Sequence, residues 1–369
     1  MISRFTDQFY RGMQVFCNVK AGLDLRSRRQ HAVYSALRRR YYRDYWEEVA
    51  ASLDAVVQDV GYDYLRIMKG KHWTFVRSYE VMLDNHLVLK MAGNKPLVNR
   101  ILAENGFPVP RFVEYNRSSL SKALNFLKSV DCDLVVKPSS GGGGRGVTTK
   151  IADERQLRSA SKSAFLFSKN LLAEEQIAGR SYRLLYLDGV FLEGVRRDPP
   201  SIIGDGQSSV RKLVSLENQK RLQGTEYLAL SPLAADLEMR LKLKQQGLSL
   251  NDVPSLDETV IVKDVVNQNA SRDNHIIPVN DFHASIVELG VHIAMIFDLK
   301  LLGLDIMCPD ISVPLEDSGG AINEINTTPG LHHHDLVATQ VEKYHIGKQI
   351  LTHIFESSEI CKLPHALNC

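Results

Sequence analysis

The chain has 369 residues, of which 44% are hydrophobic and 24% are charged, and its formal net charge is +2. This composition is typical of a globular protein with two or three subdomains, and the overall charge indicates neither nucleic acid nor a membrane surface as a partner. The five cysteines show no Cys-x-x-Cys spacing and are expected to be free thiols in a reducing compartment. The N-terminal stretch lacks the apolar run of a signal peptide, and charges interrupt the most apolar stretch, residues 287–304. We therefore expect a cytoplasmic protein without a membrane span.

The N-terminal part begins with a basic helix. Apolar side chains recur every four positions over residues 27–53, and arginines such as Arg38, Arg39 and Arg40 crowd the same segment. This basic helix either binds an anionic partner such as RNA or has a solvated or ion-paired face. The absence of a known nucleic-acid motif favours the solvated or ion-paired face. Strands are expected at 64–67 and 74–76, on either side of a turn.

The stretch LVVKPSSGGGGRGVTTK, residues 134–150, predicts a strand, a glycine loop (residues 139–146) and a second strand. Glycine accepts positive φ, so the N–H groups of this loop can converge on a phosphate, and Lys137 adds a positive charge at its start. The glycine spacing also fits the dinucleotide motif G-x-G-x-x-G, but the β-branched residues that follow are poor helix formers. No Walker-type Gly-Lys-Ser/Thr ends the loop. A glycine loop between paired strands is typical of the nucleotide lid of the ATP-grasp fold, and a plain flexible hairpin is the alternative.

Cap, turn and periodicity signals predict the remaining elements. Asp188-Gly189 indicates a tight hairpin. The predicted helices are 97–105, 119–129, 153–168, 210–222, 233–246, 282–299 and 340–355, and the predicted strands are 171–177, 182–187, 190–195, 260–266, 301–307 and 321–326.

Two of the predicted strands carry oxygen ligands. Glu324 and Asn326 are two residues apart, so they share one face of their strand, and Asp305 lies on the preceding strand. Two carboxylates and an amide oxygen suit Mg²⁺ that also holds phosphate oxygens. Ordinary polar residues at a strand edge are the alternative, and the phosphate loop in the same chain favours the metal.

The order and spacing of these motifs resemble ATP-grasp ligases. The shared motifs are Lys95 in G-N-K, Lys137 in V-V-K-P, the glycine loop, E-E-Q-I at 174–177, G-L-D at 303–305 and E-I-N-T-T-P-G at 324–330. Within that superfamily, residues 75–340 resemble the ATP-grasp part of cyanophycin synthetase, most specifically in RRDPPSIIGDGQSSVRKLV and PDISVPLEDSGGAINEINTTPG. The likeness includes neither the N-terminal domain of that enzyme nor its Mur-ligase-like half. A stand-alone ligase that makes short products is therefore expected.

The resemblance implies an α+β ATP-grasp fold. A small N-terminal α/β subdomain (1–90) is followed by a central lid subdomain with antiparallel strands (91–178) and a C-terminal subdomain with an antiparallel sheet, helices and the Mg²⁺ site (179–360). The implied ATP site comprises Lys95, Lys137, Ser139, Gly142, Gly143, Gly144, Gly146, Glu174, Gln176, Ile177 and Arg183.

Within this implied site, the two lysines contact the α- and β-phosphates, and the glycine loop closes over the β- and γ-phosphates. Glu174 accepts from the adenine amino group beside the backbone of Gln176 and Ile177. Ser181 stands where related ligases often carry an acidic residue near the ribose, so the ribose contact stays open.

Further roles concern the metal and the reacting groups. By the same resemblance, two Mg²⁺ ions are held by Asp305, Glu324 and Asn326. Arg183, Arg196 and Arg197 are expected to face the phosphates or the substrate carboxylate. The expected catalytic residues are Arg197, Lys137 and Arg272, and Arg272 is expected to stabilise an acyl phosphate.

A histidine triplet, His332-His333-His334, follows the metal strand. Either one imidazole contacts a substrate or helps to deprotonate the attacking amine, or the triplet is a loop with one buried and two solvated histidines. The second interpretation is favoured.

The expected activity is ATP-dependent amide formation between an amino acid or peptide carboxylate and an amine, through an acyl phosphate. A small-molecule kinase and a nucleotide-binding regulatory protein are the alternatives. The expected partners are amino acids or short peptides without nucleic acid or membrane, and a homodimer is left open.

Overall fold

The computed structural model describes residues 25–223, 230–338 and 342–357, with side chains from residue 29 onward. Expectations about the first 24 residues, about Cys17, Cys361 and Cys369, and about the start of the predicted helix 340–355 fall outside these residues. Within them, no helix is both long enough and apolar enough to cross a membrane.

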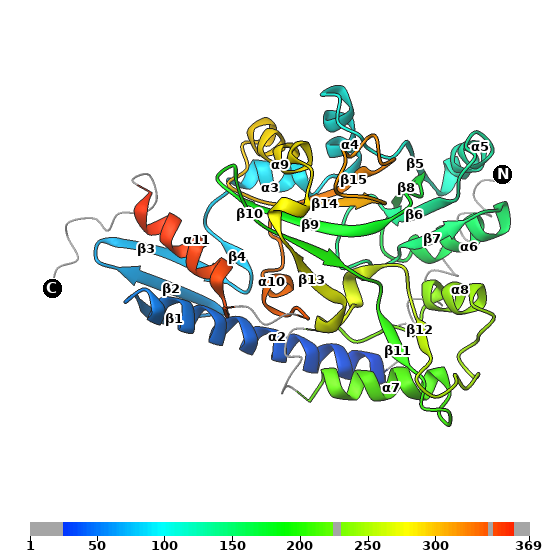
Figure 1. Cartoon of the computed structure of the whole chain (residues 1–369), viewed down its shortest axis with the longest axis horizontal. Coiled ribbons are helices and arrows are strands. Elements are labelled where there is room, and N and C mark those ends of the chain that lie inside the picture. Colours follow the sequence, from blue (N-terminus) through cyan, green and yellow to red (C-terminus); the bar gives the residue numbers. More distant parts are fainter. Residues whose placement is uncertain (1–24, 224–229, 339–341, 358–369) are drawn as a thin grey trace, which may run out of the picture.

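A five-stranded antiparallel sheet, in the order β13-β10-β9-β14-β15, lies at the centre of the molecule (Figure 1). Its strands are β9 (Arg180–Leu187), β10 (Val190–Arg197), β13 (Asn274–Ile277), β14 (Leu301–Cys308) and β15 (Ala321–Asn326). The predicted hairpin at Asp188-Gly189 is confirmed, because β9 and β10 pair across it. Both turn residues have positive φ, 49° and 75°, as the tightest hairpin turns require.

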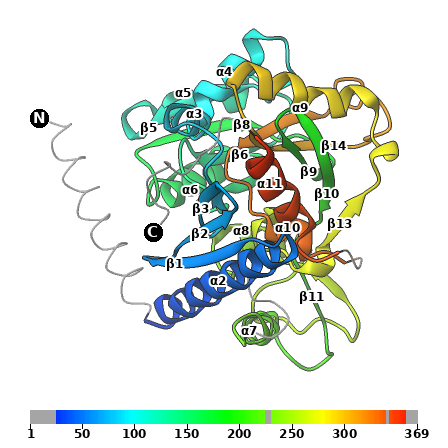
Figure 2. The same ribbon diagram turned by 90° about the vertical axis from the view of Figure 1, so that its left-hand side faces the viewer.

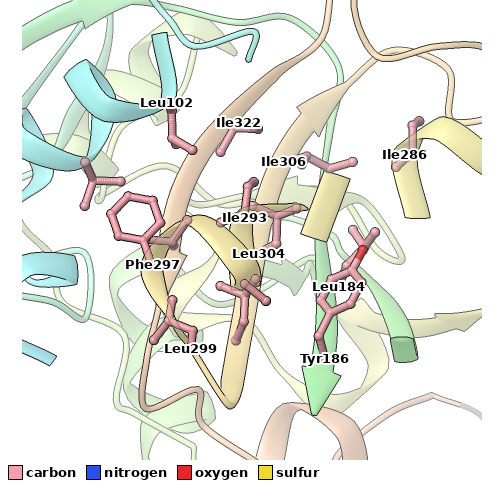
Figure 3. Packing of buried hydrophobic residues seen from close by; sticks show 14 of the residues in the cluster. Leu102, Leu184, Tyr186, Ile286, Ile293, Phe297, Leu299, Leu304, Ile306 and Ile322 are labelled. Carbon is pink, nitrogen blue, oxygen red and sulfur yellow. The ribbon is translucent and has the colours of Figure 1, made fainter. Parts of the chain in front are cut away.

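One face of this sheet packs against the amphipathic helix α9 (Ala284–Phe297). Apolar side chains alternate along β9 and β14, so that every second residue points to the same side. Figure 3 shows Leu184 and Tyr186 of β9 and Leu304 and Ile306 of β14 packed with Ile293 of α9. Helices α3 (His86–Ala92) and α4 (Lys95–Glu104) border this core. On the other face, Leu185 and Leu187 of β9 pack into the core of the N-terminal elements, and Arg183 and Asp305 lie further along the same face.

A second antiparallel sheet, in the order β5-β8-β6-β7, carries the glycine loop. Its strands are β5 (Phe112–Asn116), β6 (Leu134–Pro138), β7 (Thr148–Ile151) and β8 (Asn170–Glu175), with helices α5 (Leu120–Lys128) and α6 (Glu154–Ala164) packed on one face. The turn η1 (Arg117–Ser119) leads from β5 into α5. The glycine loop joins β6 to β7, as the sequence predicted.

The N-terminal elements pack onto the opposite end of the central sheet. Helix α2 (Leu25–Ser52) and the sheet β1 (Val56–Gly61), β2 (Tyr64–Lys69), β3 (His72–Arg77) and β4 (Glu80–Val81) share a core with α11 (His345–Glu356). Figure 2 shows α11 above α2, and the two helices are in contact. The predicted subdomain 1–90 thus shares a hydrophobic core with C-terminal residues.

The basic helix forms ion pairs within the protein. Arg39 and Arg43 pair with Asp63 and Asp59 of the β1–β2 hairpin, at 3.6 and 2.5 Å. The guanidinium of Arg38 lies over the ring of Tyr79, 4.6 Å from its centroid. These contacts match the ion-paired face that the sequence favoured.

A small insertion projects from the central sheet after β10. It contains β11 (Ser201–Ile203), α7 (Val210–Arg221), α8 (Leu237–Gln245) and β12 (Thr259–Ile261) around its own core. The predicted strand 260–266 is shorter than expected, because β12 ends at Ile261 and the chain then forms the turns η2 (Val266–Gln268) and η3 (Ser271–Asp273). The turn η4 (Val279–Asp281) leads towards α9.

The histidine triplet forms a helical turn, α10 (His332–Asp335), instead of the favoured loop. His332 and His334 are buried and His333 is half-buried, so the expectation of two solvated histidines is wrong. Tyr42 Oη lies 2.7 Å from His332 Nδ1, and His334 Nδ1 donates to Glu193 at 2.7 Å. His332 and His334 therefore connect α10 to α2 and to β10.

Glu193 joins α10 and α11 to the sheet. Its second oxygen accepts from His345 Nε2 at 3.0 Å. Burial by itself would raise the pKa of Glu193, but the bonds from His334 and His345 outweigh it and lower that pKa. The bond to Glu193 raises the pKa of His345, whereas burial lowers the pKa of His334. A charged Glu193 is thus the form that stabilises the fold.

We expect Glu193→Gln to lower the free energy of unfolding by about 2 kcal/mol, since it weakens two charge-assisted hydrogen bonds. The contribution of Glu193 is present above its unfolded pKa of about 4.3 and is lost as the pH falls through the lowered folded value. The contribution of His345 is complete below about pH 6.5 and is lost as the pH rises through its raised folded value. Urea titrations should therefore show the largest difference from the wild type between about pH 4.5 and 6.5. An equal loss in Glu288→Gln, an exposed control on α9, would contradict this account.

Candidate active site

A cavity of about 750 Å³ lies between the glycine loop and the charged face of the central sheet. The second sheet contributes residues such as Lys137 and Glu174, and the central sheet contributes residues such as Arg197, Asp305 and Glu324. The glycine loop and the segment after β12 contribute further lining residues. The residues that line it and that were predicted from sequence are Lys95, Lys137, Gly142, Gly143, Gly144, Glu174, Gln176, Ile177, Arg197, Asp305 and Glu324.

The glycine loop has a backbone that only glycine adopts readily. Gly141, Gly143, Gly144 and Gly146 all have positive φ. Gly144 also has no room for a side chain, because a Cβ at this position would lie 2.7 Å from Val265 Cγ1. Ser139 and Gly146, which were expected to bind the nucleotide, are at the ends of the loop and do not line the cavity. The backbone N–H of Ser139 is instead bonded to the carbonyl of Asn170.

Gly144→Ala is expected to raise the dissociation constant of Mg·ATP about tenfold, because left-handed backbone costs an L-residue about 1–2 kcal/mol and the loop must also move away from Val265. Isothermal titration calorimetry measures this constant directly. Gly142→Ala is the matched control, because Gly142 has an ordinary φ and open space around its Cα. Equal affinities for the two variants would contradict the expected binding of phosphate by the loop backbone.

Two lysines reach the cavity, and each is paired with a carboxylate. Lys95 forms an ion pair with Glu324, and Lys137 forms one with Glu174 at 2.7 Å. Lys137 and Glu174 are both almost fully buried, and Glu174 Oε2 has no partner in the described structure. A buried carboxylate oxygen without a partner is costly unless a ligand donates to it, which suits an adenine amino group.

Charged side chains gather on the cavity face of the central sheet because of strand register. Asp305 lies opposite Arg183 on β9 and opposite Glu324 on β15, and Arg197 is two residues beyond the partner of Arg183 on β10. These four residues therefore share one face. Arg183 donates to both oxygens of Asp305, at 2.6 and 2.7 Å. Burial would raise the pKa of Asp305, but Arg183 and Arg197 outweigh it and lower that pKa, so the carboxylate is ionised at neutral pH.

Arg197 is a buried cation whose charge is only weakly compensated by its neighbours. Its side chain is 2% exposed, its Nη1 lies 3.5 Å from Asp305, and its Nη2 lies 3.4 Å from Asn267 Oδ1. Its Nε has no partner among the described residues. Burial and the neighbouring Arg183 lower the pKa of Arg197 to about 10. A buried charge with such long contacts favours an anion in the cavity beside it.

The three predicted metal ligands lie on two paired strands. Asp305 and Glu324 are opposite each other, and Asn326 shares the face of Glu324. The amide nitrogen Nδ2 of Asn326 is buried without a partner in the described structure. No group of three His, Cys, Asp or Glu side chains with metal-binding geometry occurs in the described residues, and this set contains only two carboxylates. The oxygen donors fit Mg²⁺, which needs few protein ligands when phosphates complete its shell.

Three predicted arginines lie outside the cavity lining. Arg183 is buried behind Asp305, where it orients that carboxylate. Arg196 points to the other side of β10 and pairs with Asp198 at 3.0 Å. Arg272, the expected stabiliser of an acyl phosphate, donates to the carbonyl of Ser201 at 2.8 Å and is directed towards the insertion. The turn η3 turns it away, so its position does not support the expected role.

The adenine-edge residues are near their expected place. Gln176 and Ile177 line the cavity, but the backbone N–H of Gln176 is bonded to the carbonyl of Asp133 at 2.9 Å and is not offered to a ligand. Ser181 also lines the cavity.

Sequence reasoning missed several residues that line the cavity. Thr149 and Lys150 come from β7, and Asp264 comes from the segment after β12. Asn267 also lines the cavity, and it begins the polar run NQNASRDN, which the resemblance to ATP-grasp ligases led us to expect near the phosphates and the acceptor. No local pattern marked Asp264, because only the tertiary fold brings it to Lys150 at 3.2 Å.

Comparisons with known proteins identify relatives of this chain. No protein-family model matches it. It is 29% identical over 320 residues to the glutathione biosynthesis bifunctional protein GshAB of Listeria welshimeri, which covers 84% of this chain and 40% of that protein. It is 28% identical over 280 residues to cyanophycin synthetase of Nostoc, which covers 75% of this chain and 31% of that protein. The predicted resemblance to cyanophycin synthetase is confirmed, and the chain matches 40% or less of the length of each relative.

Among solved structures, a bifunctional glutathione synthetase from Pasteurella multocida matches with a TM-score of 0.52 and 22% identity. The match covers 82% of this chain and 41% of that chain. This likeness is one of fold, and it confirms the predicted α+β ATP-grasp fold.

Proposed function

We propose that this chain, which has the ATP-grasp fold, is an ATP-dependent ligase that joins the carboxylate of an amino acid or peptide to an amine. The observation that carries the proposal is the convergence on one cavity of a glycine loop with positive φ, two lysines and a poorly compensated Arg197. Names of the relatives agree with it, because glutathione and cyanophycin are both built through amide bonds. Those names describe the relatives, and this chain matches only part of their length.

The nucleotide binds between the two sheets. Glu174 Oε2 accepts from the adenine amino group, and the N–H groups of Gly142 to Gly144 surround the terminal phosphates. Lys95 and Lys137 neutralise phosphate charge, which requires each to exchange part of its present contact with a carboxylate for one with the ligand. Asp305, Glu324 and Asn326 hold Mg²⁺, which supplies charge neutralisation for phosphoryl transfer when it is bound.

Amide formation then proceeds in two balanced steps. An oxygen of the donor carboxylate attacks the γ-phosphorus, so an O–P bond forms and the bond to ADP breaks. The amine nitrogen attacks the resulting acyl phosphate, the C–O bond breaks, phosphate leaves with the donor oxygen, and the amine loses a proton. Arg197 stabilises the negative charge that develops in both steps, because its guanidinium is fixed and shielded from water. The glycine loop keeps water from the acyl phosphate.

Phosphate release from Mg·ATP tests this proposal when it is measured with amino acids and short peptides, singly and in pairs, with mass detection of products. We expect release that requires two components and a product lighter than their sum by one water. A phosphorylated product that forms without an amine would instead establish a kinase. Nucleotide binding without turnover for any pair would favour a regulatory protein.

Finer properties belong to the same proposal. The substrates are amino acids or short peptides, two Mg²⁺ ions take part, and the enzyme acts in the cytoplasm, where ATP is supplied. Internal ion pairs occupy Arg39 and Arg43, which supports a role for helix α2 that involves no nucleic acid. A homodimer remains a prediction.

A further inference from the structure

Helix α8 of the insertion bonds directly to the strand that follows the glycine loop. Glu238, in the first turn of α8, accepts from the backbone N–H of Thr149 at 3.0 Å and from its hydroxyl at 2.8 Å. Figure 1 shows α8 beside β7. Glu238 is 3% exposed, so both bonds are shielded from water. The backbone N–H of Thr149 is directed at a side chain of another subdomain, not at a neighbouring strand.

A second set of contacts lies beside the first. Asp264, at the end of the insertion, pairs with Lys150 of β7 at 3.2 Å and with Lys242 of α8 at 2.6 Å. Thr149, Lys150 and Asp264 all line the cavity. The glycine loop and β7 are therefore tied to the insertion at one wall of the nucleotide site.

These contacts connect parts with separate cores. The insertion packs around Val210, Met239 and Val260, whereas β7 belongs to the core of the second sheet. Among the described residues, the two apolar cores have no member in common, and the bonds of Glu238 to Thr149 join α8 to β7 directly. Burial raises the pKa of Glu238, and the two bonds from Thr149 oppose this shift because they stabilise the ionised carboxylate. Hydrogen bonds to an ionised carboxylate are about twice as strong as neutral ones.

We propose that Glu238 is a positioning residue that fixes β7, and with it the glycine loop, in the closed position over bound nucleotide. We call the two bonds between Glu238 and Thr149 the catch, because they hold the glycine loop closed. The acyl phosphate stays protected from water only while these bonds are intact. This second consequence rests on the proposed ligase function, whereas the bond between Glu238 and β7 does not. Glu238, which does not line the cavity, thus controls how much water reaches the acyl phosphate.

Hydrogen–deuterium exchange of the full chain tests the catch without turnover. In Glu238→Gln the amide oxygen can accept from the Thr149 N–H and the NH₂ group can donate to the Thr149 hydroxyl, so both bonds remain but lose the contribution of the charge. The peptide that covers β7 is expected to exchange about tenfold faster than in the wild type, both alone and with the ATP analogue AMP-PNP. Glu258→Gln is the matched control, because Glu258 also accepts a backbone N–H, that of Ser255 at 2.7 Å, but within the insertion. Equal exchange of β7 in the wild type and both variants would overturn the proposal.

A second variant distinguishes the loss of the contact between Glu238 and Thr149 from a general loss of stability. Thr149→Val removes the hydroxyl bond and keeps the backbone bond, and its shape is nearly conserved. If the hydroxyl and Glu238 act together, exchange at β7 in the double variant rises by less than the product of the two single effects. Effects that multiply in the double variant would mean that the two residues act independently, which contradicts the catch.

Turnover then tests the consequence for the reaction. Once a substrate pair is known, Glu238→Gln should raise the ratio of phosphate released to amide formed severalfold, since water reaches the acyl phosphate. A merely structural role would lower both amounts and leave the ratio unchanged. If no pair gives an amide, the ligase proposal fails, and the exchange measurement still decides whether Glu238 holds the lid.

Discussion

Glu324→Ala is expected to reduce amine-dependent phosphate release by about a thousandfold, because charge neutralisation by a bound metal contributes several kcal/mol to phosphoryl transfer. Glu324 is one of two carboxylates in the proposed Mg²⁺ set, and its side chain also pairs with Lys95. Steady-state kinetics over a range of Mg²⁺ concentrations measures the effect. The loss should shrink as Mg²⁺ is raised, since the variant binds the metal more weakly.

Glu316→Ala is the matched control for this prediction. Glu316 is an exposed carboxylate in the connection between β14 and β15, so its removal tests the loss of a negative charge near the same strands. Its rate should stay within about twofold of the wild type, as is usual for surface positions. A Glu324→Ala variant that keeps its melting temperature and turns over normally would contradict the proposed metal site.

Arg197→Lys is expected to lower kcat by about a hundredfold and to leave the KM for ATP nearly unchanged. The reason is that removal of one preorganised donor typically costs about 10²–10³ in rate. A lysine keeps the charge but loses the planar fork that reaches Asp305 and Asn267 together. Equal losses in kcat and kcat/KM indicate an interaction made only in the transition state.

Arg100→Lys is the control for the arginine series, because Arg100 is an exposed residue of α4 outside the cavity lining. A higher KM for ATP in Arg197→Lys, without a change in kcat, would assign this residue to ground-state binding of the nucleotide instead. That result would leave the fold unchanged and remove Arg197 from the catalytic step.

Local patterns in the sequence were sufficient for much of the fold. The glycine loop, the Asp188-Gly189 hairpin and the alternating strands β14 and β15 each combine a strong turn or period signal with a matching structure. Asp305 and Glu324 could be paired in advance because adjacent antiparallel strands bring a fixed face together. In these three cases one short segment decides the geometry, and the prediction agrees with the structure.

The remaining features depend on contacts that are distant in sequence. Arg183 was expected to face the nucleotide, but its pairing with Asp305, 122 residues away, follows from the register of β9 and β14. Arg272 follows Asn267 by five residues, and only the course of the η3 turn decides which of them reaches the cavity. His332 and His334 are buried because α2 and Glu193 cover them, which no local pattern records.

The path of one oxygen atom tests the central claim most directly. The donor carboxylate is labelled with ¹⁸O, and the released phosphate is analysed by mass spectrometry during turnover with Mg·ATP and the amine. Transfer of one labelled oxygen to phosphate for each amide formed is the result that an acyl phosphate requires. Phosphate without label, or label retained in a phosphorylated product, would contradict ligase chemistry at this site.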